Sequence, residues 1–144
     1  MNALKFKDLL KSFEDDMGFY QAQWIPLGRP FSFDIYKSWI QDGSHAEMNY
    51  LKDHLPIKEK PQIRWPQARS ALVFLAPYYP TSQNESFPLK ETRVSLYAQG
   101  RDYHIWFREK LQQVIKVLKE SFPEEFFFAA TDSVPILERD LGAQ

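Results

Sequence analysis

Residues 70–78 read SALVFLAPY, a continuous apolar run. A run of this length, rich in branched and aromatic side chains, is typical of a central strand that is covered on both faces. Residues 125–130 read EFFFAA and predict a second buried strand. Residues 20–27 read YQAQWIPL, which roughly alternates and predicts a third strand. Pro26 limits this third strand to an edge position or to a strand end.

Helical patterns lie between these strands. The predicted helices cover residues 3–16, 33–41, 46–54, 103–120 and 135–141. Ser32 can cap the second of these helices and Gly43 can end it. Asp102 can cap the longest helix, and Pro135 suits the first turn of the last one. We therefore predict an α/β or α+β domain with a single mixed β-sheet flanked by helices.

The composition limits the classes of function. The 144 residues suffice for one domain, and the net charge of −1 excludes a globally basic nucleic-acid-binding surface. The absence of cysteine excludes disulfides, zinc–thiolate sites and cysteine-ligated iron–sulfur clusters within this chain. Neither a signal peptide nor an apolar run of membrane-spanning length is found, so we expect a cytoplasmic protein with no membrane partner.

The histidines do not predict a metal site. His45, His54 and His104 do not pair at metal-ligand spacing, so we predict no metal site. The Asp-x-His-x-x-Gly pattern of some cobalamin proteins fails after Asp102 and His104, because Phe107 occupies the glycine position. His104 has two interpretations, a hydrogen-bonded core histidine or a ligand-facing donor in the first turn of a helix.

Two further features each have a structural and a functional interpretation. The loop predicted over residues 56–66 carries Lys58, Lys60 and Arg64. It is either a solvated loop or a patch that contacts RNA phosphates, with Trp65 stacking on a base. Asp132 follows the predicted strand 125–130 and precedes a predicted helix. It is either the cap of that helix or a partly desolvated carboxyl that donates a proton.

Four stretches of the chain carry a family resemblance. They read WIQDGSHAEMNYL at 39–51, PQARS at 66–70, YAQGRDYH at 97–104 and TDSVPILER at 131–139. In this order and spacing they resemble the epoxyqueuosine reductase family. One departure is Ala46, which stands where the family usually has glycine.

The resemblance implies an oxidoreductase of queuosine biosynthesis, which reduces the epoxide of epoxyqueuosine in tRNA to queuosine. It implies base-off cobalamin as the cofactor, and two [4Fe-4S] clusters in a following ferredoxin-like part. It also implies a fold related to the cobalamin-binding domain of reductive dehalogenases and to flavin-reductase-like cobalamin-processing proteins. We expect residues 1–144 to be an N-terminal cobalamin- and substrate-binding domain, truncated before the cluster domain and inactive alone.

The resemblance also implies roles for individual residues. Asp132 would be the proton donor, and Arg139 would orient substrate or cofactor from the same face of a helix, two turns further on. Residues expected to contact the cofactor are Arg101, Tyr103 and His104, and those expected to contact tRNA are Lys58, Lys60 and Arg64. The external electron donor is left open, and self-association of the chain is possible. The alternative function is a cobalamin carrier without redox activity of its own.

Overall fold

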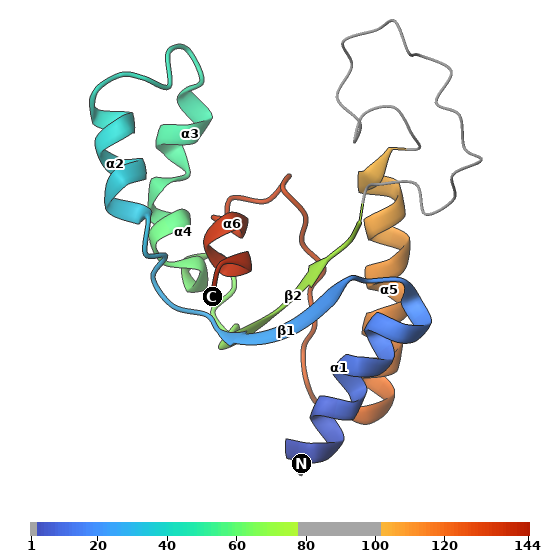
Figure 1. The fold of residues 1–144 in the computed structure, drawn as a ribbon. Helices are drawn as coiled ribbons and strands as arrows, with labels where there is room; N and C mark the ends of the chain where they lie inside the picture. The colour runs from blue at the N-terminus through green and yellow to red at the C-terminus, as the bar shows by residue number, and fades with distance from the viewer. Residues whose placement is uncertain (1–2, 78–101) are drawn as a thin grey trace, which may run out of the picture. The chain divides into compact units, whose positions relative to one another are not determined.

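The computed structural model describes residues 3–77 and 102–144 as helices with a small sheet (Figure 1). In chain order the elements are α1 (Ala3–Met17), β1 (Gln21–Pro26), α2 (Phe33–Gln41), α3 (Asn49–Asp53), α4 (Leu55–Glu59), the 3₁₀ helix η1 (Pro61–Ile63), β2 (Ser70–Leu75), α5 (Tyr103–Ser121) and α6 (Glu138–Gly142). This content is consistent with an α+β fold. Among the described helices, none has the length and apolar character needed to span a membrane.

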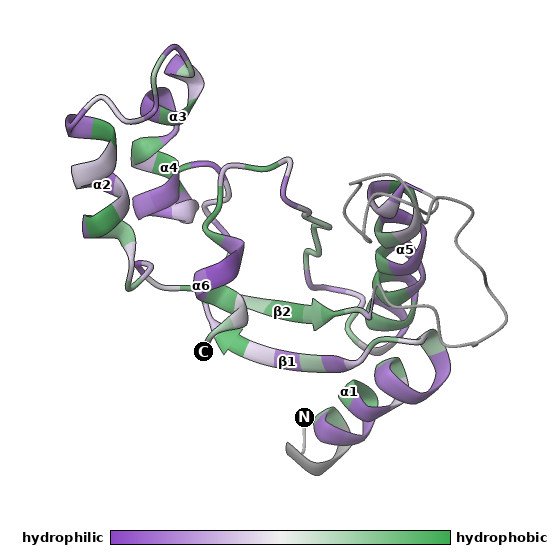
Figure 2. Cartoon of the chain, turned by 45° about the horizontal axis from the view of Figure 1, so that its top comes forward, coloured by the Kyte–Doolittle hydropathy of each residue, from purple (hydrophilic) through white to green (hydrophobic). Residues whose placement is uncertain are grey.

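The sheet of the described residues consists of β1 and β2. The Tyr20 N–H donates to the Leu75 carbonyl at 2.7 Å, and the Leu27 N–H donates to the Arg69 carbonyl at 2.9 Å, so the strands are antiparallel. The prediction of a mixed sheet is therefore wrong for this part of the chain. β2 is hydrophobic along most of its length (Figure 2), but its middle residues are only half-buried and both ends are exposed. It is not the fully covered central strand that was predicted.

The second predicted buried strand is absent from the structure. Residues 126–131 belong to no helix or strand. Phe126 is 67% exposed and Phe128 is 52% exposed, so this aromatic run is not a core segment. A strand needs a neighbouring strand and a face to bury, because β-propensity depends strongly on context. No strand in the part of the chain that is described pairs with these residues.

The helix predictions were right for the longer helices. α2 has the predicted bounds, and α5 begins after Asp102, whose side chain accepts a hydrogen bond from the His104 N–H at 2.9 Å. The helix predicted over 46–54 is the shorter α3, and the one predicted over 135–141 begins only at Glu138. Gly43 follows α2 with a φ of +71°, and Ala46 has a φ of +50°. Ala46 thus retains a backbone conformation that favours the glycine expected there from the resemblance.

The chain divides into two compact units, and the first comprises Met1–Ala22 and Phe74–Thr131. Its core is formed by apolar side chains of α1 and α5 and by the start of β1. These buried residues are Phe13, Phe19, Ala22, Leu111, Val114 and Leu118. The ring of Phe74 packs 4.6 Å from that of Phe19 and 5.9 Å from that of Phe13. The apolar stripe predicted for α5 therefore supplies much of this core.

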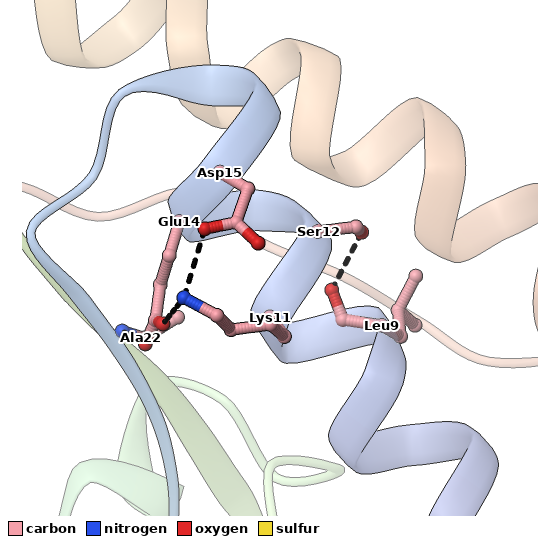
Figure 3. A network of polar contacts seen from close by, with 6 residues as sticks. All are labelled: Leu9, Lys11, Ser12, Glu14, Asp15 and Ala22. Carbon is pink, nitrogen blue, oxygen red and sulfur yellow. Dashed lines mark hydrogen bonds and ion pairs between the residues drawn. The ribbon is translucent and has the colours of Figure 1, made fainter.

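A polar network on α1 also fixes the start of β1 (Figure 3). The Glu14 carboxylate accepts a hydrogen bond from the Ala22 N–H at 2.9 Å. Lys11 reaches Glu14 at 3.3 Å and Asp15 at 2.8 Å, which are the spacings of neighbouring side chains on one helical face. Glu14 thereby joins the helix to the strand that follows it.

The second unit comprises Gln23–Val73 and Asp132–Gln144. It contains α2, α3, α4, η1 and α6. Its buried apolar side chains are Ile25, Phe33, Ile40 and Leu141. Because Leu141 is among them, the last helix contributes to the core of this unit although it lies far along the chain.

Candidate functional site

Asp132 lies in a turn after a segment that forms no helix or strand, and it is exposed. The prediction of a partly desolvated carboxyl at the end of a buried strand is therefore wrong, because that strand does not form. The helix-cap alternative is also wrong, since α6 begins at Glu138 and its N-cap position is Leu137. Arg139 is exposed in α6, and no continuous helix joins it to Asp132. The argument that the two residues share a helical face does not hold.

Asp140 is a residue that the sequence analysis missed. The residue is only 5% exposed, and its carboxylate accepts two hydrogen bonds from Ser32, from the backbone N–H at 2.9 Å and from Oγ at 2.6 Å. Ser32 occupies the N-cap position of α2, although its hydroxyl makes no cap bond within that helix. The negative charge of Asp140 near the start of α2 is favourable for the helix dipole. The contact joins α6 to α2 within the second unit.

Loss of this contact gives a measurable prediction. Asp140→Ala is expected to lower the free energy of unfolding by about 1–3 kcal/mol, because it leaves the Ser32 donors without their acceptor. Glu138→Ala on the same helix is the control, since Glu138 is exposed, and should change the value by about 0.5 kcal/mol or less. Urea denaturation of the chain compares the two variants. If both variants lowered the free energy of unfolding by the same amount, the Asp140 contact would not contribute to stability.

The three cations predicted to lie on one loop have different surroundings. Lys58 is in α4, Lys60 precedes η1 and Arg64 follows it, so much of residues 56–66 is helical and not the loop that was predicted. Lys58 is half-buried and donates to the Ile136 carbonyl at 3.3 Å. Lys60 and Arg64 are exposed, and the Arg64 guanidinium lies 5.7 Å from the centre of the Trp65 ring. Only these two of the three cations have their side chains largely in solvent.

Tyr103 and His104 form a stacked pair at the start of α5 in the first unit, with ring centres 4.0 Å apart. The His104 side chain is 38% exposed, so the core interpretation of this histidine is wrong. Its Nδ1 lies 2.9 Å from the Asp102 carboxylate. The hydrogen bonds from the His104 ring and from the His104 backbone N–H hold the pKa of Asp102 below its usual value. Arg101, the third residue expected to contact the cofactor, lies outside the described residues.

Two surface hollows, of about 560 and 490 Å³, are each lined by residues of the second unit. Arg29 lines the larger one and forms hydrogen-bonded ion pairs with Asp34 at 2.7 Å and Glu59 at 3.1 Å. These carboxylates raise the pKa of Arg29, and its guanidinium lowers the pKa of Asp34. Neither hollow is lined by Asp132 or Arg139.

Comparison with known proteins gives the family. A sequence model described as epoxyqueuosine reductase QueG, DUF1730, matches residues 58–133, just over half of the chain. The chain belongs to this family. The recognition made from four short stretches of sequence is thereby confirmed.

Curated relatives extend the similarity beyond the matched residues. The epoxyqueuosine reductase of Cellulophaga algicola is 29% identical, and the alignment covers 97% of this chain and 45% of the relative. That of Pseudomonas aeruginosa is 30% identical over 94% of this chain and 38% of the relative. The epoxyqueuosine reductase of Cyclobacterium marinum is 30% identical, and its alignment covers 72% of this chain and 33% of the relative. The chain therefore spans less than half the length of these relatives. No solved structure shows a significant match.

The match to the epoxyqueuosine reductase family includes most of the candidate site residues. Lys58 is its first residue, and Asp132 lies one residue before its end. Arg139 and Asp140 lie beyond it. No sequence pattern could have paired Asp140 with Ser32, because 108 positions separate them.

Proposed function

We propose that this chain is the N-terminal part of an epoxyqueuosine reductase that acts on tRNA in the cytoplasm. In the proposed reaction the epoxide of epoxyqueuosine is reduced to the ring alkene of queuosine. The observation that carries the proposal is the family match over residues 58–133. Relatives with the same name align with nearly all of this chain but extend well beyond it. The proposal therefore concerns the complete protein, and we expect the isolated chain to be inactive.

The proposed reaction requires a proton source near the epoxide. Its reduction to an alkene consumes two electrons and two protons, breaks both carbon–oxygen bonds and releases the oxygen as water. Asp132 is the proposed donor of a proton to the departing oxygen, and Arg139 is the proposed orienting residue. Both roles are supported by the resemblance of residues 131–139 to the family and by the position of both residues in the second unit.

Cobalamin is the proposed cofactor of the complete protein, where it would supply electrons to the epoxide. The described residues do not by themselves fit a group of this size. Pockets for drug-sized ligands are about 300–1,000 Å³ and cover most of the ligand. The hollows of about 560 and 490 Å³ are open, and cobalamin is larger than such ligands. Cobalamin therefore stays a proposal based on the resemblance, as do the contacts expected from Tyr103 and His104.

The proposed substrate and electron supply involve different parts of the protein. Lys60 and Arg64 are exposed, and the Arg64 guanidinium lies beside the Trp65 ring, a combination of cations and an aromatic ring that suits single-stranded RNA. This chain has no cysteine. The two proposed [4Fe-4S] clusters would therefore need cysteines from the additional length that the relatives have.

The test uses the complete protein, reconstituted with cobalamin and with iron and sulfide, and supplied with a chemical reductant. The substrate is tRNA bearing epoxyqueuosine, and queuosine is measured by mass spectrometry of the digested nucleosides. We expect queuosine to form only when cobalamin is present. Unmodified tRNA is the control. Stoichiometric cobalamin binding without any queuosine would replace this proposal by the alternative of a cobalamin carrier.

A further inference from the structure

Lys58 differs from the neighbouring cations in what its ammonium group contacts. Its Nζ donates to the Ile136 carbonyl at 3.3 Å and lies 5.2 Å from the centre of the Tyr36 ring. Tyr36 is itself fixed, because its hydroxyl donates to the Leu51 carbonyl at 3.0 Å. The Lys58 side chain thus connects α2 and α4 to the segment before α6, all within the second unit.

Burying part of the Lys58 ammonium group costs free energy, because a charge is less stable away from water. Burial lowers the pKa of Lys58, and the negative charge of Glu138 partly opposes this shift. A half-buried cation is tolerated when its hydrogen bonds are satisfied and when an aromatic face lies nearby. The Ile136 carbonyl accepts one hydrogen bond from this ammonium group, and the Tyr36 ring supplies the aromatic face. An RNA contact would instead need the charge at the surface, where Lys60 and Arg64 are.

The carbonyl that receives this hydrogen bond lies between the two proposed reductase residues along the chain, Asp132 in the segment before α6 and Arg139 in α6 itself. Residues 126–137 form no helix or strand, so side-chain contacts must contribute to fixing their path. Lys58 holds the segment at Ile136, between Asp132 and Arg139. Asp140, in α6, makes a second contact through Ser32. The two contacts lie on either side of Arg139 along the chain.

We propose that Lys58 is a positioning residue of the reductase site rather than a tRNA contact, and that it acts through the Ile136 carbonyl to place Asp132 and Arg139. This inference rests on the proposed function. It gives the cations of residues 58–64 different roles. The half-buried Lys58 fixes the segment before α6, whereas the exposed Lys60 and Arg64 contact the tRNA.

The experiment compares variants of the complete protein. Lys58→Met keeps the unbranched shape and most of the length of the side chain but removes its donor and charge, and Lys58→Arg restores both. We expect Lys58→Met to lower kcat about 10-fold or more, since small displacements of reacting groups have large effects on rate. We expect its KM for tRNA to stay unchanged and Lys58→Arg to recover most of the rate. Lys52→Met, at an exposed position of α3, should match the parent protein.

Two further measurements separate positioning from RNA binding. Hydrogen exchange of the amides in residues 132–141 should become faster in Lys58→Met and stay unchanged in Lys52→Met. The salt dependence of tRNA binding should be unaffected by Lys58→Met, whereas Lys60→Met should raise KM. Loss of one phosphate contact should reduce the slope of log K against log salt by about 0.7–0.9.

Several results would overturn the inference. One is a reduced salt slope with an unchanged kcat for Lys58→Met, which would make Lys58 a tRNA contact. Another is hydrogen exchange in residues 132–141 of Lys58→Met that is as slow as in the parent protein. If circular dichroism shows that Lys58→Met is unfolded, Lys58→Gln, whose neutral amide ends one bond short of the ammonium position, takes its place with the same criteria. If the parent protein forms no queuosine, the proposed function fails, while the exchange data still decide whether Lys58 holds this segment.

Discussion

Replacing Asp132 with asparagine is expected to lower the formation of queuosine about 100-fold or more, because the amide has no carboxyl proton to transfer. Asp132 is exposed and caps no helix. The free energy of unfolding should therefore change by about 1 kcal/mol or less. Turnover is measured with the complete, reconstituted protein and tRNA bearing epoxyqueuosine, together with cobalamin content and melting temperature.

The control for this variant is Asp53→Asn, which changes an exposed carboxylate at the end of α3 in the same unit. It should leave turnover at the parental level. Normal melting and cobalamin content with a collapsed turnover in Asp132→Asn would support the proton-donor role. Turnover near that of the parent would mean that the proton comes from water or from another side chain, and Asp132 would then have no catalytic role.

Phe13→Ala is expected to be the most destabilising single substitution considered for this chain. Phe13 is completely buried in the first unit, and its ring packs edge-on against Phe74. Truncating a buried phenylalanine costs about 3–5 kcal/mol, because it removes buried apolar surface and leaves a cavity. This is a large part of the roughly 5–15 kcal/mol that stabilises a typical domain. Urea denaturation of the 144-residue chain measures the loss.

Phe126→Ala is the matched control, and it also tests the correction of the predicted strand. Phe126 is 67% exposed, so its truncation should cost about 0.5 kcal/mol or less. If both phenylalanine variants lost several kcal/mol, Phe126 would be buried in solution. The structural account of residues 126–131 would then be wrong, and the original prediction of a core strand would be restored.

Local signals predicted the longer helices well. The Asp102 cap and the apolar stripe of α5 depend on residues only a few positions apart, and the structure has both. The bounds of α2 were predicted for the same reason. The shorter helices were placed less well, because helices of five residues such as α3 and α6 depend more on their surroundings than on propensity.

The apolar run at residues 125–130 shows where local reasoning failed. Hydrophobicity indicated a buried strand, but a strand also needs a partner, and the described part of the chain supplies none to this segment. The proposed burial of Asp132 and the shared helical face with Arg139 both depended on that strand and on an early start of α6. Both failed because the segment forms no strand and the helix begins only at Glu138.

The sequence by itself determined the family, the long helices and the identity of β1 and β2, because motifs, caps and periodicity are properties of neighbouring residues. Only the tertiary structure decided that Asp140 reaches Ser32 and that Lys58 reaches Ile136. These contacts join residues far apart along the chain, and the burial of a charge depends on what packs around it. Lys58, Lys60 and Arg64 look alike in the sequence, and the fold alone separates the half-buried cation from the exposed ones.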